Sequence, residues 1–255
     1  MQYDPKELMP LFMDYGEALL ASGGEVRRLE DTMDYLAEAY GGIRVDAFAI
    51  SSLILLTVDF GEGGVHSISR CVPRWNGTDF EKLELLNRLS RTVSRAPLSP
   101  QEFRAELDRI SQVHTHPVKK ILGSGLAAGA FAMFFGGGIL EGLLAFFFGL
   151  VALVLQFYFA PRMRSRVSFL FVVSLLSGLG IYALGLTPLP VQCDMVVIGV
   201  IMLLVPGIAI TTAVRDLFIG DTVTGSSRLM ESIIGAAAMA AGYMLSMILF
   251  AGGVL

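Results

Sequence analysis

The stretch ILEGLLAFFFGLVALVLQFYFA, residues 139–160, decides the class of protein to which this chain belongs. It contains a single charged residue, Glu141, and a helix needs about 20 apolar residues to cross the hydrocarbon core of a bilayer. We therefore expect a transmembrane helix here. Apolar runs of similar length cover about 118–137, 167–186, 194–214 and 230–253. Residues 118–255 thus predict an α-helical bundle of five transmembrane helices.

The charged residues fall mostly in the other half of the chain. Residues 1–120 hold 14 of the 19 Lys and Arg and 18 of the 23 Asp and Glu. This first half is a polar domain with an acidic excess, so it gives no clustered positive face for a nucleic acid. We expect membrane lipid, and no nucleic acid, among the partners of the protein.

Residues 1–117 predict an α+β domain. Apolar residues recur at helical spacing over 5–21 and 24–40, which predicts two helices. The period then changes to two in IRVDAFAI (43–50) and in GVHSISRC (64–71), on either side of a buried apolar run, which indicates two or three strands. Polar helices are expected near 79–95 and 100–113.

The positive charges of the membrane half predict its orientation. They all lie at the start of the first expected span, between the second and third spans or between the fourth and fifth, whereas the opposite loops have none. The positive-inside rule assigns such loops to the cytoplasm. The N-terminal domain is then cytoplasmic and the C-terminus periplasmic or external. The residues concerned are Lys119, Lys120, Arg162, Arg164, Arg166, Arg215 and Arg228.

The fourth expected span is interrupted by Pro206 and Gly207, which tend to break a helix. In lipid the freed backbone groups must find partners, and the N-terminus of a half-helix carries partial positive charge that suits a carboxylate. Thr211 and Thr212 follow in the first turns after the break, and Arg215 about one turn further on. These five residues predict a substrate-binding site for an anion. The alternative is a proline kink that leads into an ordinary cytoplasmic loop with solvated charges.

Other ionisable residues of the membrane half are candidates for coupling or gating, because charges at membrane depth are costly and often functional. Glu141 and Asp194 lie near the outer face, where a carboxylate can instead reach water. Glu231, at the inner start of the fifth expected span, is placed to pair with Arg228 or Arg215. The full set of candidates is Glu141, Asp194, Asp216, Asp221, Arg228 and Glu231.

Enzymatic chemistry finds little support in the sequence. The histidines His66, His114 and His116 all precede the membrane half, so the spans can hold neither a Ser-His dyad nor an H-E-x-x-H zinc helix. No P-loop motif occurs either. We therefore expect no catalytic residue, no metal site and no cofactor.

Two segments carry a resemblance to a known family. LLASGGEVRRLEDTMDYLAEAYG (19–41) and LVPGIAITTAVRDLFIGDTVTGSSRLMESI (204–233) resemble the threonine/serine exporter family of bacterial inner-membrane proteins, and the resemblance spans nearly the whole chain. It implies an inner-membrane exporter of small carboxylated metabolites. The family members with a fused architecture carry a second membrane segment of about equal size, whereas five spans are expected in these 255 residues.

This difference makes the chain similar to the larger, five-span subunit of the split-type members, which act with a small membrane protein subunit. One such pair is a succinate exporter, whereas the fused members export threonine and serine. The resemblance therefore implies a heteromeric partner and leaves two substrate classes, a dicarboxylate or threonine/serine. Small residues in the spans also favour a packed bundle or a homo-oligomer. The alternative function is a non-transporting membrane receptor or scaffold with a regulatory cytoplasmic domain.

In the polar domain, Ser22, Gly23, Arg28 and Glu30 match the resemblance best. Ser22 is expected to be the N-cap of the second helix, with Glu25 completing a capping box. Arg28 and Glu30 are interpreted either as a docking surface or as part of a solvated helix face.

Overall fold

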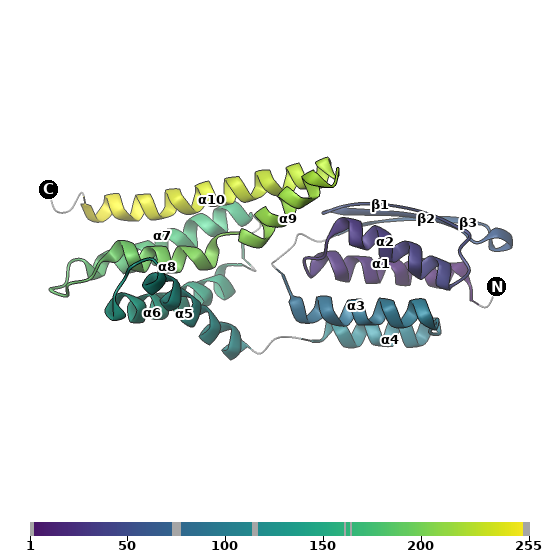
Figure 1. Ribbon diagram of the computed structural model, residues 1–255, viewed down its shortest axis with the longest axis horizontal. Coiled ribbons are helices and arrows are strands. Elements are labelled where there is room, and N and C mark those ends of the chain that lie inside the picture. Colours follow the sequence, from purple (N-terminus) through teal and green to yellow (C-terminus); the bar gives the residue numbers. More distant parts are fainter. Residues whose placement is uncertain (1–2, 73–77, 114–116, 161, 164, 252–255) are drawn as a thin grey trace. The chain divides into compact units, whose positions relative to one another are not determined.

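The structure is a computed structural model that describes residues 3–72, 78–113, 117–160, 162–163 and 165–251. The chain divides into two compact units, Met1–His114 and Thr115–Leu255. Figure 1 shows the elements of both units along the chain.

Within 3–72 and 78–113, the first unit combines four helices with a three-stranded antiparallel sheet. The sheet has the order β1-β2-β3, in which Ala49 pairs with Ile54 and Leu56 with Ile68. The helices and strands expected from the sequence are therefore confirmed to within a few residues at their ends. The elements are α1 (Pro5–Ala21), α2 (Val26–Ala39), β1 (Arg44–Ile50), β2 (Leu53–Asp59), β3 (Val65–Cys71), α3 (Phe80–Arg95) and α4 (Pro100–Ser111), with a short 3-10 turn at Gly61–Gly63.

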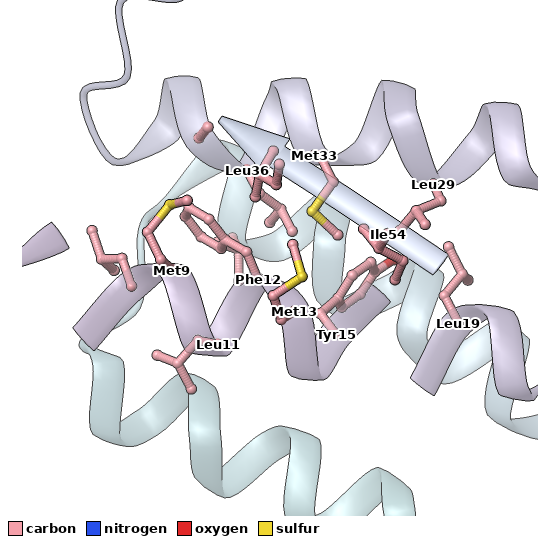
Figure 2. Close-up of a cluster of buried hydrophobic side chains, with 14 of the residues drawn as sticks. Met9, Leu11, Phe12, Met13, Tyr15, Leu19, Leu29, Met33, Leu36 and Ile54 are labelled. Atoms are coloured by element: carbon pink, nitrogen blue, oxygen red, sulfur yellow. The ribbon is translucent and has the colours of Figure 1, made fainter. Parts of the chain in front are cut away.

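The core of this unit lies between α1, α2 and one face of the sheet (Figure 2) and continues to buried residues of α3 and α4. Phe12, Leu29 and Ile54 are exposed by 1% or less, and each such side chain contributes about 1.5–3 kcal/mol through burial. A Cβ added at Gly16 would lie 3.0 Å from Ile54 Cδ1, so glycine allows α1 to approach the sheet closely. The helical spacing of apolar residues in the sequence thus becomes the packed face of α1.

The turn between α1 and α2 differs from the prediction. Ser22 is the C-cap of α1, and the N–H groups of Gly23 and Gly24 close its last turn at 3.0 and 2.9 Å, which is a Schellman motif. Gly23 has a φ of +87°, a conformation that glycine adopts readily. α2 begins at Val26, and in the described residues its N-cap, Glu25, makes no side-chain cap hydrogen bond. The predicted Ser22–Glu25 capping box is therefore wrong.

Within 117–160, 162–163 and 165–251, the second unit has helices and no strand. Three of its helices, α6, α7 and α10, are long and apolar enough to cross a membrane, and the bent pair α8 and α9 makes a fourth if it counts as one span. The described residues thus show three or four candidate spans, and the fifth expected span stays a prediction. The elements are α5 (Pro117–Phe134), α6 (Ile139–Phe159), α7 (Arg166–Leu184), α8 (Cys193–Leu204), α9 (Gly207–Phe218) and α10 (Thr222–Ala251).

The helix that falls short is α5, which has 18 residues and two lysines, Lys119 and Lys120, in its first turn. Yet α5 packs closely on two neighbours. A Cβ added at Gly129 would lie 2.7 Å from the carbonyl oxygen of Gly142 in α6, and one added at Gly199 in α8 would lie 2.5 Å from that of Ala128. These small residues let the backbones approach, as the sequence predicts. A crossing by α5 stays a prediction.

Helices α7 and α10 run parallel to each other and side by side (Figure 1). Gly242 of α10 faces Ser174 of α7, and further along both helices Ser246 faces Gly178. Because the residue numbers of both helices rise from the first contact to the second, the two helices point the same way. The chain between them must therefore return to the side from which α7 starts, which is the path that α8 and α9 provide.

Candidate functional site

The fourth expected span is broken at the position that the sequence predicts. α8 ends at Leu204, Val205 is extended with φ −60° and ψ 126°, and α9 begins at Gly207 after its N-cap, Pro206. The axes of the two helices differ by 51°. Proline has no N–H to donate and disfavours the helical conformation of the residue before it. These two properties explain the extended Val205 and the bend.

The start of α9 assembles only part of the predicted anion site. Gly207 is exposed, and the first N–H groups of a helix have no partner within the helix, so this end carries partial positive charge. The hydroxyls of Thr211 and Thr212, however, donate to the carbonyls of Gly207 and Ile208, both at 2.9 Å. Their hydrogens are thus engaged in the helix itself. Pro206 is buried and only fixes the break.

Arg215 does not join this helix start. It lies in the last turn of α9, eight residues after Gly207, which corresponds to about 12 Å along the helix axis. Its side chain is exposed. The structure therefore does not bring Arg215 together with the break, and the five predicted residues do not form one compact cradle.

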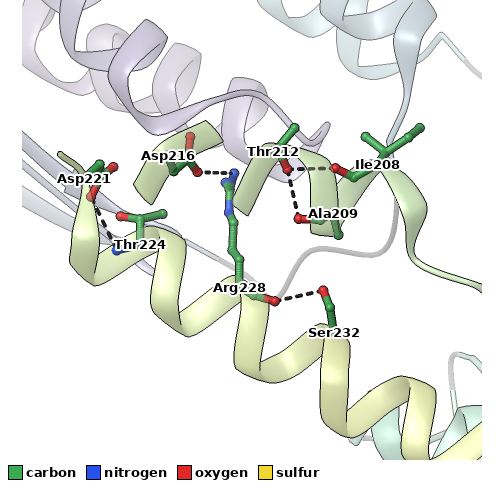
Figure 3. A network of polar contacts seen from close by, with 8 residues as sticks. All are labelled: Ile208, Ala209, Thr212, Asp216, Asp221, Thr224, Arg228 and Ser232. Atoms are coloured by element: carbon green, nitrogen blue, oxygen red, sulfur yellow. Dashed lines mark hydrogen bonds and ion pairs between the residues drawn. The ribbon is translucent and has the colours of Figure 1, made fainter. Parts of the chain in front are cut away.

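A different pair of charges meets between α9 and α10 (Figure 3). The Nη1 atom of Arg228 lies 3.4 Å from Oδ2 of Asp216. Asp216 is 4% exposed and the Arg228 side chain 19% exposed. A charge in such surroundings is stable only when it is paired and hydrogen-bonded. The pair combines two residues that the sequence analysis considered separately.

The hairpin of α9 and α10 brings these residues together. Gly220, with a φ of +92°, ends α9, and Asp221 then caps α10 by accepting from the N–H of Thr224 at 3.4 Å. A Cβ added at Gly225 would lie 2.9 Å from the carbonyl oxygen of Ala213. The two helices can therefore approach closely enough for the Arg228 side chain to reach Asp216.

Two hydroxyls extend this pair. Thr212 precedes Asp216 by four residues and Thr224 precedes Arg228 by four, so each lies one helical turn away on the same face. Thr224 is 1% exposed, and its hydroxyl has no hydrogen-bond partner in the described part of the chain. We name Thr212, Asp216, Thr224 and Arg228 the hairpin cluster. It offers one cation, one anion and two hydroxyls.

Among the remaining coupling candidates, Asp221 and Glu231 have local roles. Asp221 is the cap described above, and its backbone carbonyl also accepts from Gly225 at 3.0 Å. Glu231 is exposed, and its charge acts on Arg166 at the start of α7. The expected pairing of Glu231 with Arg228 or Arg215 is replaced by the Asp216–Arg228 pair.

The two acidic residues expected near the outer face differ from each other. Glu141 is 7% exposed and accepts hydrogen bonds from the backbone N–H groups of Gly138 at 2.8 Å and Gln192 at 3.2 Å. It therefore fastens the start of α6 to the segment before α8. Asp194, at the start of α8, is exposed. Neither residue contacts the hairpin cluster in the described structure.

In the first unit, three of the four motif residues make contacts that hold the fold together. Glu30 accepts a hydrogen bond from the N–H of Ala49 at 2.9 Å and so fastens α2 to the edge strand β1. Arg28 is exposed, while Ser22 and Gly23 end α1. The described residues contain no group of three or more His, Cys, Asp or Glu side chains that could hold a metal ion.

Comparison with known families covers both units. A family model described as "Putative threonine/serine exporter" (ThrE) matches residues 10–250. The chain belongs to this family. Membership in the threonine/serine exporter family confirms the resemblance seen in the sequence, and a transporter family is consistent with a protein that is not an enzyme. No curated protein and no solved structure matched the chain.

Thr224 is the member of the hairpin cluster that was not singled out in the sequence, apart from its place in a polar run. Its hydroxyl stood in a run of polar residues, TVTGSSR (222–228), that looked solvated. The spacing of four between Thr224 and Arg228 was the available signal. That signal becomes meaningful only when α9 is known to cover this face of α10.

Proposed function

We propose that this protein exports threonine or serine across the membrane and that the hairpin cluster binds the amino acid as a zwitterion. The observation that carries the proposal is the buried Asp216–Arg228 pair in a member of the threonine/serine exporter family. Two opposite charges held 3.4 Å apart complement a small molecule that carries both charges itself.

Each charged group of the amino acid has a counterpart in the hairpin cluster. The guanidinium of Arg228 suits the carboxylate, since its fork of donors forms two parallel hydrogen bonds with such a group. The carboxylate of Asp216 suits the ammonium group. When the solute enters, each side chain exchanges its partner for a solute group, so no charge is left unpaired.

The hydroxyl of Thr224 adds a third contact, because it is buried without a partner and can hydrogen-bond the side-chain hydroxyl of threonine or serine. A dicarboxylate such as succinate would bring a second negative charge toward Asp216, which is unfavourable. The cluster therefore favours an amino acid over the dicarboxylate that the split-type resemblance implies.

The proposal includes an assembly. We take α5 as a fifth crossing because it packs on α6 and α8 along small residues, although its sequence begins with two lysines. The positive loops then place the N-terminal unit in the cytoplasm and the C-terminus outside the bacterial inner membrane. A small membrane protein subunit completes the transporter.

Solute efflux from proteoliposomes tests the function. Purified protein, alone and with its membrane partner, is reconstituted into vesicles loaded with radiolabelled threonine, serine or succinate. We expect efflux of threonine and serine and little efflux of succinate. Efflux of succinate alone would exclude the zwitterion site but keep an exporter. If none of the three solutes leaves the vesicles in either preparation, the receptor or scaffold alternative is favoured.

The double variant Asp216→Asn/Arg228→Gln tests the site, because it removes both charges and leaves neither unpaired. We expect it to fold and to lose threonine efflux. The matched control is Glu231→Gln, which neutralises an exposed residue on the same helix, α10. Normal efflux by the folded double variant would rule out the hairpin cluster as the substrate site.

A further inference from the structure

A second group of buried hydroxyls lies in the interior of the helix bundle. Ser174, Ser177 and Tyr243 are exposed by 0%, 1% and 4%. None of their hydroxyls has a hydrogen-bond partner in the described residues. Other hydroxyls in the same bundle behave differently: Ser232 donates to the carbonyl of Arg228 at 2.8 Å, and Ser246 to that of Tyr243 at 2.7 Å. A serine hydroxyl in a membrane helix thus has a local acceptor available, and Ser174 and Ser177 do not use one.

All three hydroxyls lie along the seam between α7 and α10. Ser174 packs against Gly242, at 3.0 Å from a Cβ placed there, and Tyr243 packs against Gly178 in the same way. Ser177 lies close to the Tyr243 hydroxyl, yet the two hydroxyls do not reach hydrogen-bond geometry. Both helices are candidate spans, and the three residues stand well inside them.

The seam is closed in the structure. A Cβ added at Gly242 would lie 2.6 Å from the carbonyl oxygen of Phe171, and one added at Gly178 would overlap the Ser246 hydroxyl. The two helices are therefore tightly packed at both glycines. In a bilayer no water reaches the three hydroxyls from outside, so the closed seam keeps them unsatisfied, which is unfavourable.

We propose that Ser174, Ser177 and Tyr243 line an aqueous passage that forms when α7 and α10 separate and that hydrogen-bonds small polar solutes there. Opening the seam gives each hydroxyl the partner that it lacks in the closed arrangement. The passage itself follows from the buried hydroxyls. Only the identity of the solute, threonine or serine, rests on the proposed function.

A neighbouring residue extends the row of polar groups toward one end of the bundle. Tyr182, also on α7, is only half-buried and lies within electrostatic range of both Tyr243 and Asp194. Asp194 is exposed at the start of α8. A solute that left the seam in this direction would thus pass from buried neutral hydroxyls to a hydrated carboxylate. The hairpin cluster lies elsewhere on α10, because Arg228 precedes Tyr243 by about 22 Å of helix.

Labelling of an introduced cysteine tests the passage without any transport. Cys71 and Cys193 are first replaced by serine, and Ser177→Cys is then introduced into the full chain in proteoliposomes. The probe is a membrane-impermeant methanethiosulfonate, which reacts with a thiolate and so needs water at the site. Two controls come from the same helix: Leu176→Cys at a position exposed on the surface of the bundle, and Val173→Cys at a buried apolar position.

We expect Ser177→Cys to react at least about tenfold faster than both controls, because only this position meets water when the seam opens. Equal rates at Ser177→Cys and Val173→Cys would overturn the passage. Added threonine should slow the reaction of Ser177→Cys severalfold. If added threonine leaves the labelling rate of Ser177→Cys unchanged, the passage does not bind threonine, whatever the efflux experiment shows.

A measurement on the unmodified protein covers the case in which the cysteine variants fail to fold. Hydroxyl radicals formed by brief X-ray exposure oxidise an internal side chain only where water lies beside it. We expect Tyr243 to be oxidised several times faster than Phe169, which is also buried on this pair of helices at 8% exposure. Tyr243 oxidised no faster than Phe169 would contradict the passage.

Discussion

Arg228 on α10 lies 3.4 Å from Asp216 on α9, and the two side chains neutralise each other where the helices of the hairpin meet. Asp216 is almost fully buried and Arg228 mostly so. If the proposed function holds, the pair couples stability to binding, because an amino acid would exchange partners with both side chains. On the same proposal it would distinguish two chemical classes of substrate, since a zwitterion satisfies both side chains and a dicarboxylate satisfies one.

Breaking this pair on one side should destabilise the protein more than removing both charges. Asp216→Asn leaves the guanidinium of Arg228 buried beside a neutral amide, and the loss of one partner of a buried pair costs about 3–5 kcal/mol. The double variant Asp216→Asn/Arg228→Gln should lose much less stability than Asp216→Asn. Thermal unfolding in detergent measures both. Equal losses in the single and double variants would mean that the two charges do not depend on each other.

Replacing Pro206 should straighten the broken span. Pro206→Ala restores an N–H and lets Val205 take the helical conformation, so α8 and α9 can continue as one helix. Each has 12 residues, or about 18 Å, and removing the 51° bend lengthens the end-to-end distance by about 4 Å. Spin labels at Gln192 and Phe218 measure this distance by electron paramagnetic resonance. An unchanged distance would show that tertiary packing, and not proline, sets the bend.

Removing Glu141 should loosen the link between α6 and α8. Glu141→Ala deprives the N–H groups of Gly138 and Gln192 of their charged acceptor, and hydrogen bonds to charged groups contribute about 1.5–3 kcal/mol each. We expect a lower unfolding temperature in detergent and faster hydrogen exchange at the amide of Gln192. The control Asp194→Asn, at an exposed carboxylate, should change neither. Loss of efflux with full stability would instead support a coupling role for Glu141.

Stability of the first unit should fall at alkaline pH because of Tyr40. Burial raises the pKa of the Tyr40 phenol from 10.0 to about 12. The unfolded chain then releases this proton at lower pH than the folded one. The free energy of unfolding therefore keeps its full contribution from Tyr40 below pH 10 and decreases as the pH rises to about 12. The loss is roughly 2 kcal/mol.

Tyr40→Phe should remove most of this pH dependence, and denaturant unfolding of the full chain between pH 9 and 12 measures it. Tyr15 leaves a residual slope of the same sign, because burial raises the pKa of its phenol as well. A slope as steep in Tyr40→Phe as in the parent protein would assign the alkaline loss to other groups.

Local signals in the sequence were sufficient for most elements. The apolar spacing of α1 and α2, the alternation in β1 and β3, and the glycines after Phe134 each determine a conformation over a few residues, and the structure confirms them. The capping box at Ser22 failed for a local reason too, since Gly23 ends α1 first and places Ser22 on the other side of the turn.

By itself, the sequence determined that half of the chain is apolar helix and that Pro206 interrupts one helix, because composition and backbone preference act locally. Two sequence segments also carried the resemblance to an exporter family. Only the tertiary structure decided which charges meet. Arg215 and Arg228 look alike in sequence, but the close approach of Gly225 to α9 brings Arg228 to the buried Asp216 and leaves Arg215 exposed. Likewise, the serines of α7 are ordinary helix residues until α10 covers them and removes their access to water.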